Sequence, residues 1–296
     1  MRVLLLLSLT ALSATKGPSD EGLVIKLVKT WKKCVADNEP CKNRPSDRDG
    51  MWATEQEARD SFTRHETLHD LGKKYGTDKV RHGFLQIYAD LFGAPEAVKN
   101  MMEIGVFYGA SIQMWRDYFV NARVYGVDGF TGIMGNGKVE CPQGSCIGDL
   151  YMKKEPFGPR VKLVKADQGD SSVMEGMAKE LQKEKISFDV IVEDGSHKYE
   201  DQQKNLAQLF PLIKPGGYYV IEDLHSSLQK GYDAPARSYN TTLEVIKRFM
   251  STNSFDSPFL SDKQKRYLDK TIAFARPLAA WNRTMASSSV CILRKK

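Results

Sequence analysis

Acidic residues stand where apolar segments end in the second half of the sequence. These segments end at or near Glu103, Asp128, Asp167, Asp194 and Asp223. If the segments are parallel strands, the carboxylates meet at one edge of a sheet, which is where such sheets bind ligands. A single acid at a strand end usually caps the following helix. Acids at successive strand ends are hard to explain as caps alone, so they indicate a binding site.

A histidine, His197, follows Asp194 by three residues in the stretch "EDGSH". Histidine is the usual general base near neutral pH, and a hydroxyl that acts as a nucleophile needs such a base within reach. A histidine at a helix start can also simply pack locally, but its place just after a strand-end acid favours the base. His225 is a weaker alternative base and is equally well explained as a surface loop residue.

A glycine-containing turn follows the first of these apolar segments, in "EIGVFYGAS". Gly105 allows a tight turn, and Gly109 allows the backbone at the start of a helix to approach a ligand closely. The turn is not a G-x-G-x-x-G motif, because Phe107 stands in place of the second glycine. Asp128, which ends the next segment, has the position of a carboxylate that accepts both hydroxyls of a ribose.

Strand-like and helix-like segments alternate from residue 98 onward. The expected strands are 98–106, 122–128, 161–167, 186–195, 217–224, 270–281 and 287–296, and the expected helices between them are 107–119, 171–184 and 199–213. Apolar strands alternating with amphipathic helices predict a parallel sheet covered on both faces. The fold class is therefore α/β: a Rossmann-like, doubly wound, mostly parallel seven-stranded sheet with a C-terminal antiparallel hairpin. An N-terminal extension with helices at 53–76 and 83–93 precedes it.

The region from about Leu71 to Leu224 resembles the class I S-adenosylmethionine-dependent methyltransferases. Within them it looks like the macrolide-sugar O-methyltransferases of the demethylmacrocin and mycinamicin type. The shared stretches are "KYGTDK", "EIGVFYGASIQMW", "YGVD", "DQGD", "FDVIVEDGSH" and "LFPLIKPGGYYVIEDL". "GTDK" and "DGSH…PGGYYVIEDL" are the specific ones. The N-terminal residues and the insert around Cys141 and Cys146 lie outside the resemblance.

The resemblance implies a function and a set of site residues. The expected reaction is methylation of a hydroxyl, with a sugar or glycoside as the acceptor, by S-adenosylmethionine with Mg²⁺ or Mn²⁺. The residues expected to bind S-adenosylmethionine are Glu103, Gly105, Gly109 and Ser111, with Asp128 at the ribose and Asp167 and Gln168 at the adenine end. Asp194 and Asp223 match the metal ligands, and His197 matches the base. No third protein ligand is placed, because Glu193 and Glu222 are expected to point off the opposite face of their strands.

A second motif, "HETLH", suggests a zinc metalloprotease with His65 and His69 as ligands and Glu66 as base. A catalytic zinc site needs three protein ligands, and Tyr75 stands where the third is expected. The segment also runs directly into "KYGTDK". We therefore interpret the motif as a coincidence on a surface helix.

The net charge of +6 comes from lysines and arginines spread along the chain. No dense basic run is present, so nucleic-acid binding is not expected. A secreted, non-catalytic binding protein on a methyltransferase fold is an alternative, but such a protein would be expected to lose Asp128, Asp194 or His197. A homo-oligomer is left open.

The N-terminal stretch "MRVLLLLSLTALSATKG" has the layout of a secretory signal peptide. The expected domains are a signal peptide at 1–16, an extension at 17–95 and a methyltransferase domain at 96–296. No span is expected in the mature chain, which we place in the secretory pathway, in the lumen or secreted. Sequons at Asn240 and Asn282 agree with this route. In an oxidising lumen Cys34 can pair with Cys41 and Cys141 with Cys146, whereas Cys291 is expected to be a buried thiol.

Overall fold

The computed structural model describes residues 55–131, 155–228, 239–279 and 289–296. Contacts divide the chain into two units, one of Met1–Gly93 with Ala280–Ala286 and one of Ala94–Ala279 with Ser287–Lys296. The predicted signal peptide, the two predicted disulfides and the sequon at Asn282 lie outside the described residues. The predicted domain limits stay a prediction.

The first unit is helical in its described part. Its helices are α3 (Glu55–Tyr75), α4 (Lys79–His82) and α5 (Phe84–Leu91). Gly72 lets α3 lie against the other two, because a Cβ there would stand 2.8 Å from a methyl group of Val80 and nearly touch Leu85. The helices predicted at 53–76 and 83–93 are present as α3 and α5.

The second unit is built on one seven-stranded sheet with the order β3-β2-β1-β4-β5-β7-β6. Its strands are β1 (Asn100–Ile104), β2 (Arg123–Asp128), β3 (Val161–Lys165), β4 (Phe188–Glu193), β5 (Ile213–Ile221), β6 (Ile272–Ala279) and β7 (Ser289–Lys295). The first five strands are parallel, whereas β7 pairs antiparallel with both β5 and β6. Val190, Ile191 and Val192 in β4 have no exposed surface, as expected for a strand covered on both faces. The predicted fold class is confirmed.

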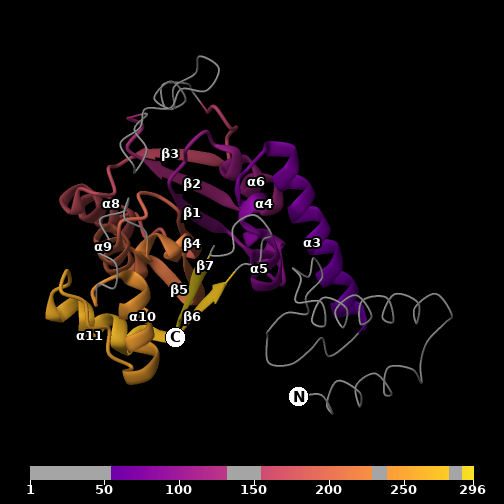
Figure 1. Ribbon diagram of the computed structural model, residues 1–296. Coiled ribbons are helices and arrows are strands. Elements are labelled where there is room, and N and C mark those ends of the chain that lie inside the picture. The colour runs from indigo at the N-terminus through magenta and orange to yellow at the C-terminus, as the bar shows by residue number, and fades with distance from the viewer. Residues whose placement is uncertain (1–54, 132–154, 229–238, 280–288) are drawn as a thin grey trace, which may run out of the picture. The chain divides into compact units, whose positions relative to one another are not determined.

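Helices cover both faces of this sheet (Figure 1). They include α6 (Ala110–Tyr118), α8 (Ser171–Lys183) and α9 (Tyr199–Leu209). Figure 1 shows α6 on one side of the strands and α8 and α9 on the other. The chain moves outward from β1 to β2 and β3 and then returns to β4 and β5 on the other side of β1. The strand order therefore reverses between β1 and β4, and doubly wound sheets bind their ligands at this point.

Helices α10 (Thr242–Thr252) and α11 (Asp262–Thr271), like the short α4, were not expected from the sequence. The Thr241 side chain caps α10 by accepting from the Glu244 amide, and Ser261 and Gln264 form a capping box at the start of α11. The S-x-x-Q spacing is the signal that would have found α11. No helix in the described ranges is long and apolar enough to cross a membrane.

Candidate active site

The glycine turn after β1 touches the loop after β4. Gly105 has φ +93°, and a Cβ at this position would clash with the backbone carbonyl oxygen of Asp194. The Asp194 amide donates to the Ile104 carbonyl oxygen at 2.9 Å. Only glycine fits this left-handed, closely packed position. The turn and the first predicted metal ligand are therefore held side by side at the switch point.

Asp128, at the end of β2, binds the backbone of the same turn. Its Oδ2 accepts from the amide of Val106 at 2.9 Å and from that of Phe107 at 3.4 Å, and its Oδ1 accepts from the Phe130 amide at 2.7 Å. A carboxylate offers about four lone-pair sites, so these bonds leave capacity for a further donor. The assignment of Asp128 to a ribose stays a prediction, but the carboxylate also fixes the turn.

Glu103 lies in β1, just before the turn, and has no exposed surface. One of its oxygens accepts from the Ser111 hydroxyl at 2.6 Å, and the other accepts from Nε1 of Trp115 at 3.1 Å. The structure thus brings together Glu103 and Ser111, two of the residues predicted at the cofactor. In this arrangement both side chains tie the first turn of α6 to β1.

Asp167 and Gln168 follow β3. Asp167 is exposed and accepts from the Gly169 amide at 2.9 Å. The Gln168 side chain lies directly against Gly195, where a Cβ would overlap its amide group. Its buried Oε1 has no hydrogen-bond donor among the described residues. A buried acceptor of this kind calls for a donor from water or a ligand.

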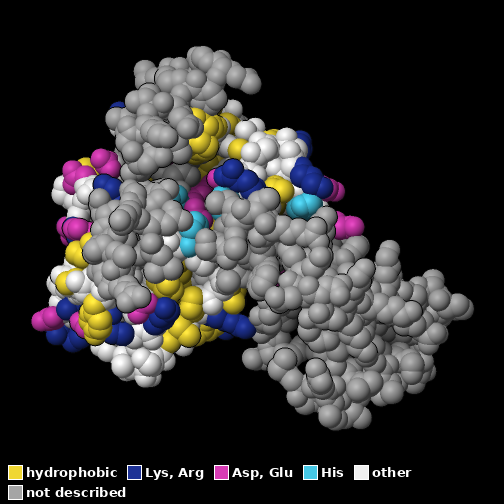
Figure 2. Space-filling view, viewed as in Figure 1, with side chains coloured by type: hydrophobic (Ala, Val, Ile, Leu, Met, Phe, Trp, Pro, Cys, Tyr) yellow, Lys and Arg dark blue, Asp and Glu magenta, His cyan; other side chains and the backbone are white. Residues whose placement is uncertain are grey.

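Asp194, His197 and Asp223 form a group beyond the carboxyl ends of β4 and β5. Each is half-buried, and one ligand atom from each lies within 4.8 Å of the others. His197 Nε2 stands 3.6 Å from Asp223 Oδ2, which is too long for a hydrogen bond. Figure 2 shows histidine side chains at the surface close to acidic ones near the middle of the visible face.

The backbone is strained at two members of this group. His197 has φ +58° and Asp223 has φ +52°, both in the left-handed region. A left-handed conformation in a residue other than glycine costs on the order of 1–3 kcal/mol and is found mainly at functional sites. The hydroxyl of Ser226 donates to the His197 carbonyl oxygen at 2.9 Å and so helps to hold this conformation.

Further carboxylates surround the group. Glu193 is fully buried, and its pKa is raised well above the usual value by burial first and then by the charges of Asp194, Asp201 and Asp223. Burial also raises the pKa of Asp201, against the effect of a hydrogen bond from Ser196. Both shifts favour the neutral form of these carboxyl groups in a poorly solvated place, and a bound cation would favour their ionised form.

Residues 102–224 match a protein family described as "Methyltransferase domain". The chain contains a methyltransferase domain. The match begins in β1 and ends just after Asp223, so it includes the turn, Asp128 and the whole Asp194 group.

Curated relatives of this methyltransferase domain carry the names of sugar O-methyltransferases. Mycinamicin VI 2''-O-methyltransferase of Micromonospora griseorubida is 25% identical over 226 residues, which are 71% of this chain and 50% of that protein. An 8-demethyl-8-alpha-L-rhamnosyl tetracenomycin-C 2'-O-methyltransferase of Streptomyces olivaceus is 29% identical over 220 residues, covering 69% and 50%. The chain thus spans about half the length of the curated relatives it matches.

A solved structure supports the fold of the methyltransferase domain. The mycinamycin-pathway enzyme MycE, in complex with Mg, SAH and mycinamycin VI, is 24% identical and superposes with a TM-score of 0.57. The match covers 77% of this chain and 54% of that chain. The likeness confirms the Rossmann-like methyltransferase architecture.

Some expectations about residues near the site need correction. His225, described as a possible surface loop residue, is buried, with Nδ1 3.6 Å from Asp223 Oδ1. Asp223 therefore has a histidine ring near each of its two oxygens. The expectation for Glu193 and Glu222 needs no correction, because both are buried and neither belongs to the group of three.

The zinc-protease alternative depends on α3, in the other unit. Glu66 is exposed and His69 is half-buried rather than on an open surface, while the side chain of His65 lies outside the described residues. Among the described side chains, Asp194, His197 and Asp223 are the only group that could hold a metal ion. His65 is not among the described side chains, so zinc binding at "HETLH" stays untested.

Cys291 and the sequon at Asn240 lie in described segments. Cys291 is a buried free thiol in β7, as predicted, and burial raises its pKa. Asn240 is half-buried, and Thr242 of its sequon has no exposed surface and donates to the Tyr199 carbonyl oxygen at 3.2 Å. Attachment of a glycan to Asn240 stays a prediction.

Proposed function

We propose that this protein is an S-adenosylmethionine-dependent O-methyltransferase that acts on a sugar hydroxyl with the help of a divalent metal ion. One observation carries the proposal. The glycine turn contacts Asp194 directly, so the expected cofactor site adjoins a group of two carboxylates and an imidazole inside a methyltransferase domain. A methyl donor and an activated hydroxyl need this proximity.

The residues at the strand ends fit a divalent ion such as Mg²⁺ or Mn²⁺. Carboxylate oxygens are the preferred ligands of such ions, and Asp194 and Asp223 supply them within 4.8 Å of each other. A bound ion would supply Lewis-acid stabilisation of the acceptor oxygen.

His197 is the residue proposed to take the proton from the acceptor hydroxyl. It accepts this proton on a ring nitrogen while the acceptor oxygen forms its bond to the methyl carbon and the bond from carbon to sulfur breaks. The products are a methyl ether, S-adenosylhomocysteine and a protonated imidazole, which Asp223 at 3.6 Å stabilises. The protein mainly orients the reacting groups, because the sulfonium methyl is already activated.

The structure also allows His197 to act as the third metal ligand, since its ring nitrogen belongs to the same group. The two roles exclude each other for one nitrogen atom. Metal binding by a His197→Ala variant distinguishes them, because a base can be removed without loss of the ion.

The acceptor class is supported by the names of the relatives, which methylate sugars of macrolide and tetracenomycin compounds. The test is mass spectrometry of purified protein incubated with S-adenosylmethionine, Mg²⁺ and a panel of glycosides. We expect a product 14 mass units heavier, about one methylene, with wild-type protein and not with Asp194→Asn. A wild-type protein that binds S-adenosylmethionine but methylates no hydroxyl would favour a non-catalytic binding role.

Entry into the secretory pathway is a separate proposal, supported by the apolar N-terminal run and the two sequons. In eukaryotic cells the product is expected to lose its first residues and to run faster on a gel after glycosidase treatment. A cytosolic product that keeps Met1 or begins at Arg2 would contradict it.

A further inference from the structure

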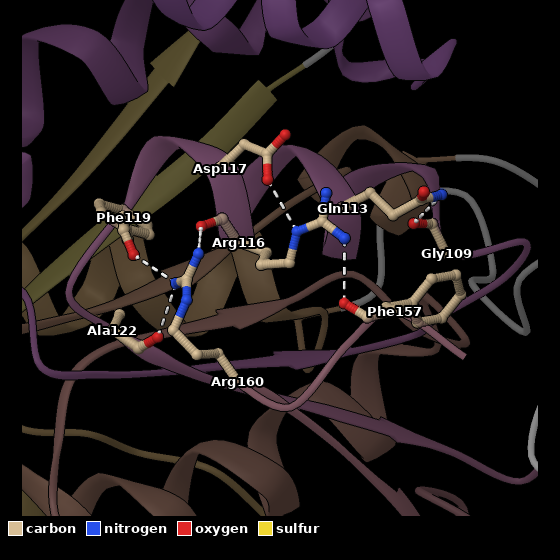
Figure 3. Close-up of polar contacts among 8 residues, drawn as sticks. All are labelled: Gly109, Gln113, Arg116, Asp117, Phe119, Ala122, Phe157 and Arg160. Carbon is tan, nitrogen blue, oxygen red and sulfur yellow. Dashed lines mark hydrogen bonds and ion pairs between the residues drawn. The ribbon is translucent and has the colours of Figure 1, made fainter. Parts of the chain in front are cut away.

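The short segment 155–160, which leads into β3, contacts α6 at both of its ends (Figure 3). At the start of the helix the ring of Phe157 meets Gly109. At the end of the helix the guanidinium of Arg160 meets three carbonyl groups. The helix between these contacts begins directly after the glycine turn, so its position sets the position of the turn.

The Phe157 ring is buried, and its tip points at the α-carbon of Gly109. A Cβ on Gly109 would collide with Cζ and lie 2.8 Å from both Cε atoms of the ring. Gly109 also has φ +77°, so the backbone of the turn is left-handed where the ring covers it. The ring therefore fills the space that a side chain on the turn would need.

Two arginines fix the backbone of the segment to α6. Arg160 donates from Nη1 to the carbonyl oxygens of Phe119 at 3.1 Å and Ala122 at 3.0 Å, and from Nη2 to that of Arg116 at 2.8 Å. Arg116 itself donates to the Phe157 carbonyl oxygen at 3.0 Å, and its Nε is held by Asp117 at 2.7 Å. These charge-assisted bonds leave Phe157 little freedom to move away from Gly109.

Helix α6 is bonded to Glu103 of β1 through Ser111 and Trp115, and Phe157 packs against Gly109 at its start. We propose that Phe157, braced by Arg116 and Arg160, is a positioning residue that sets the geometry of the cofactor turn. This inference rests on the proposed function, because it assumes that the turn binds S-adenosylmethionine. It adds to the site a residue that lies outside the glycine motif.

The test is calorimetry with S-adenosylhomocysteine, together with steady-state kinetics on S-adenosylmethionine. Phe157→Ala should weaken binding and raise KM for the cofactor by about 10- to 10²-fold, as expected for a displaced binding group. The kcat at saturating cofactor should change by no more than about twofold, because the reacting groups are untouched. Phe157→Leu, which keeps most of the bulk, should recover most of the affinity.

A matched control is Phe249→Ala, which removes another buried ring, packed on Phe255 with the ring centroids 5.9 Å apart. It should lower the melting temperature without changing KM. If Phe157 acted only through general stability, both variants would shift KM in proportion to their loss of stability, and this result would overturn the proposal.

A double-mutant cycle tests the contact itself. Gly109→Ala should impair binding strongly in wild-type protein, but it should cost clearly less in the Phe157→Ala background, where the colliding ring is gone. Additive effects would contradict the proposal. If wild-type protein binds S-adenosylhomocysteine and Phe157→Ala binds it equally well, this inference fails alone. If wild-type protein binds none, the proposed function fails as well.

Discussion

The two halves of the site differ in the groups that surround their carboxylates and in their backbone conformation. On the β1–β2 side, Asp128 and Glu103 accept hydrogen bonds from backbone amides and from side chains of α6. On the β4–β5 side, Asp223 faces two histidines at 3.6 Å, beyond hydrogen-bond distance, and the backbone is strained. The first of these, here called the cofactor half after its proposed ligand, is thus held by hydrogen bonds to the turn and to α6. The second, here called the metal half, gathers three potential metal ligands within 4.8 Å of one another.

The largest expected effect follows from removing the metal ion or one of its proposed ligands. Chelation, or Asp223→Ala, should reduce turnover by about 10³-fold or more, because electrostatic stabilisation of the acceptor oxygen is lost. Binding of S-adenosylhomocysteine should stay nearly unchanged, since its site is on the other half. Turnover assays and calorimetry on the same sample measure both. Full activity in chelator would remove the metal from the account.

The second effect concerns His197. His197→Ala should lower kcat by roughly 10²–10⁴ while the metal stays bound, as expected for loss of a general base. Higher pH should restore part of the activity, because solvent hydroxide can then take the proton. Metal content and a pH–rate profile provide the readouts. Loss of the ion with the side chain would show that His197 is a ligand, and His225→Ala would then be the next variant to examine.

The third effect belongs to the cofactor half. Asp128→Ala should weaken S-adenosylmethionine binding by about 1.5–3 kcal/mol for each charge-assisted hydrogen bond lost. Metal binding should not change, because Asp128 is not part of the Asp194 group. Calorimetry with each ligand measures the two separately. Unchanged cofactor affinity would take Asp128 out of the site.

Asp189, in β4, shows how a fully paired carboxylate behaves in the same sheet. It accepts from Lys214 at 2.8 Å and from the amides of Lys99 and Asn100. Burial is the largest single influence and raises its pKa, but the three partners together lower it more. The pKa of Asp189 therefore lies below the usual 3.8. Such a group stabilises the folded state above the unfolded pKa of 3.8, and this stability is lost as pH falls through the folded pKa. Asp189→Asn should destabilise the protein by about 1–3 kcal/mol at pH 7. Urea unfolding should show that this difference shrinks below pH 3.8, and a constant difference would contradict the assignment.

The smallest effect is expected at Phe107, which has φ +50° in the glycine turn. Phe107→Gly should remove about 1 kcal/mol of backbone strain from the folded state. Part of this gain is offset, because glycine increases the conformational entropy of the unfolded chain. Lys185→Gly, at an exposed position with φ +57°, is the matched control. Urea unfolding should show a similar small gain for both. A loss of stability at Phe107 alone would mean that its ring packing supports the fold.

The sheet, and the grouping of acidic residues beyond its strand ends, could be predicted because their signals are local. Continuous apolar strands, glycine turns and strand-end acids are read within a few residues of sequence, and parallel topology then places the acids together. The left-handed backbone of His197 and Asp223 could not be predicted, since no local sequence pattern marks it. The packing of Phe157 on Gly109 joins residues distant in sequence and has no local pattern. Helix α10 was missed although Thr241 and Glu244 have the S/T-x-x-E/Q spacing of a helix start, the same kind of signal that marks α11.

The most direct test of the account is a crystal of this protein soaked with Mn²⁺ and S-adenosylhomocysteine and measured for anomalous scattering. The account predicts a manganese peak within coordination distance of the Asp194 and Asp223 carboxylates, and S-adenosylhomocysteine at the glycine turn with its ribose at Asp128. A crystal in which S-adenosylhomocysteine occupies the turn and no manganese lies between Asp194 and Asp223 would contradict it.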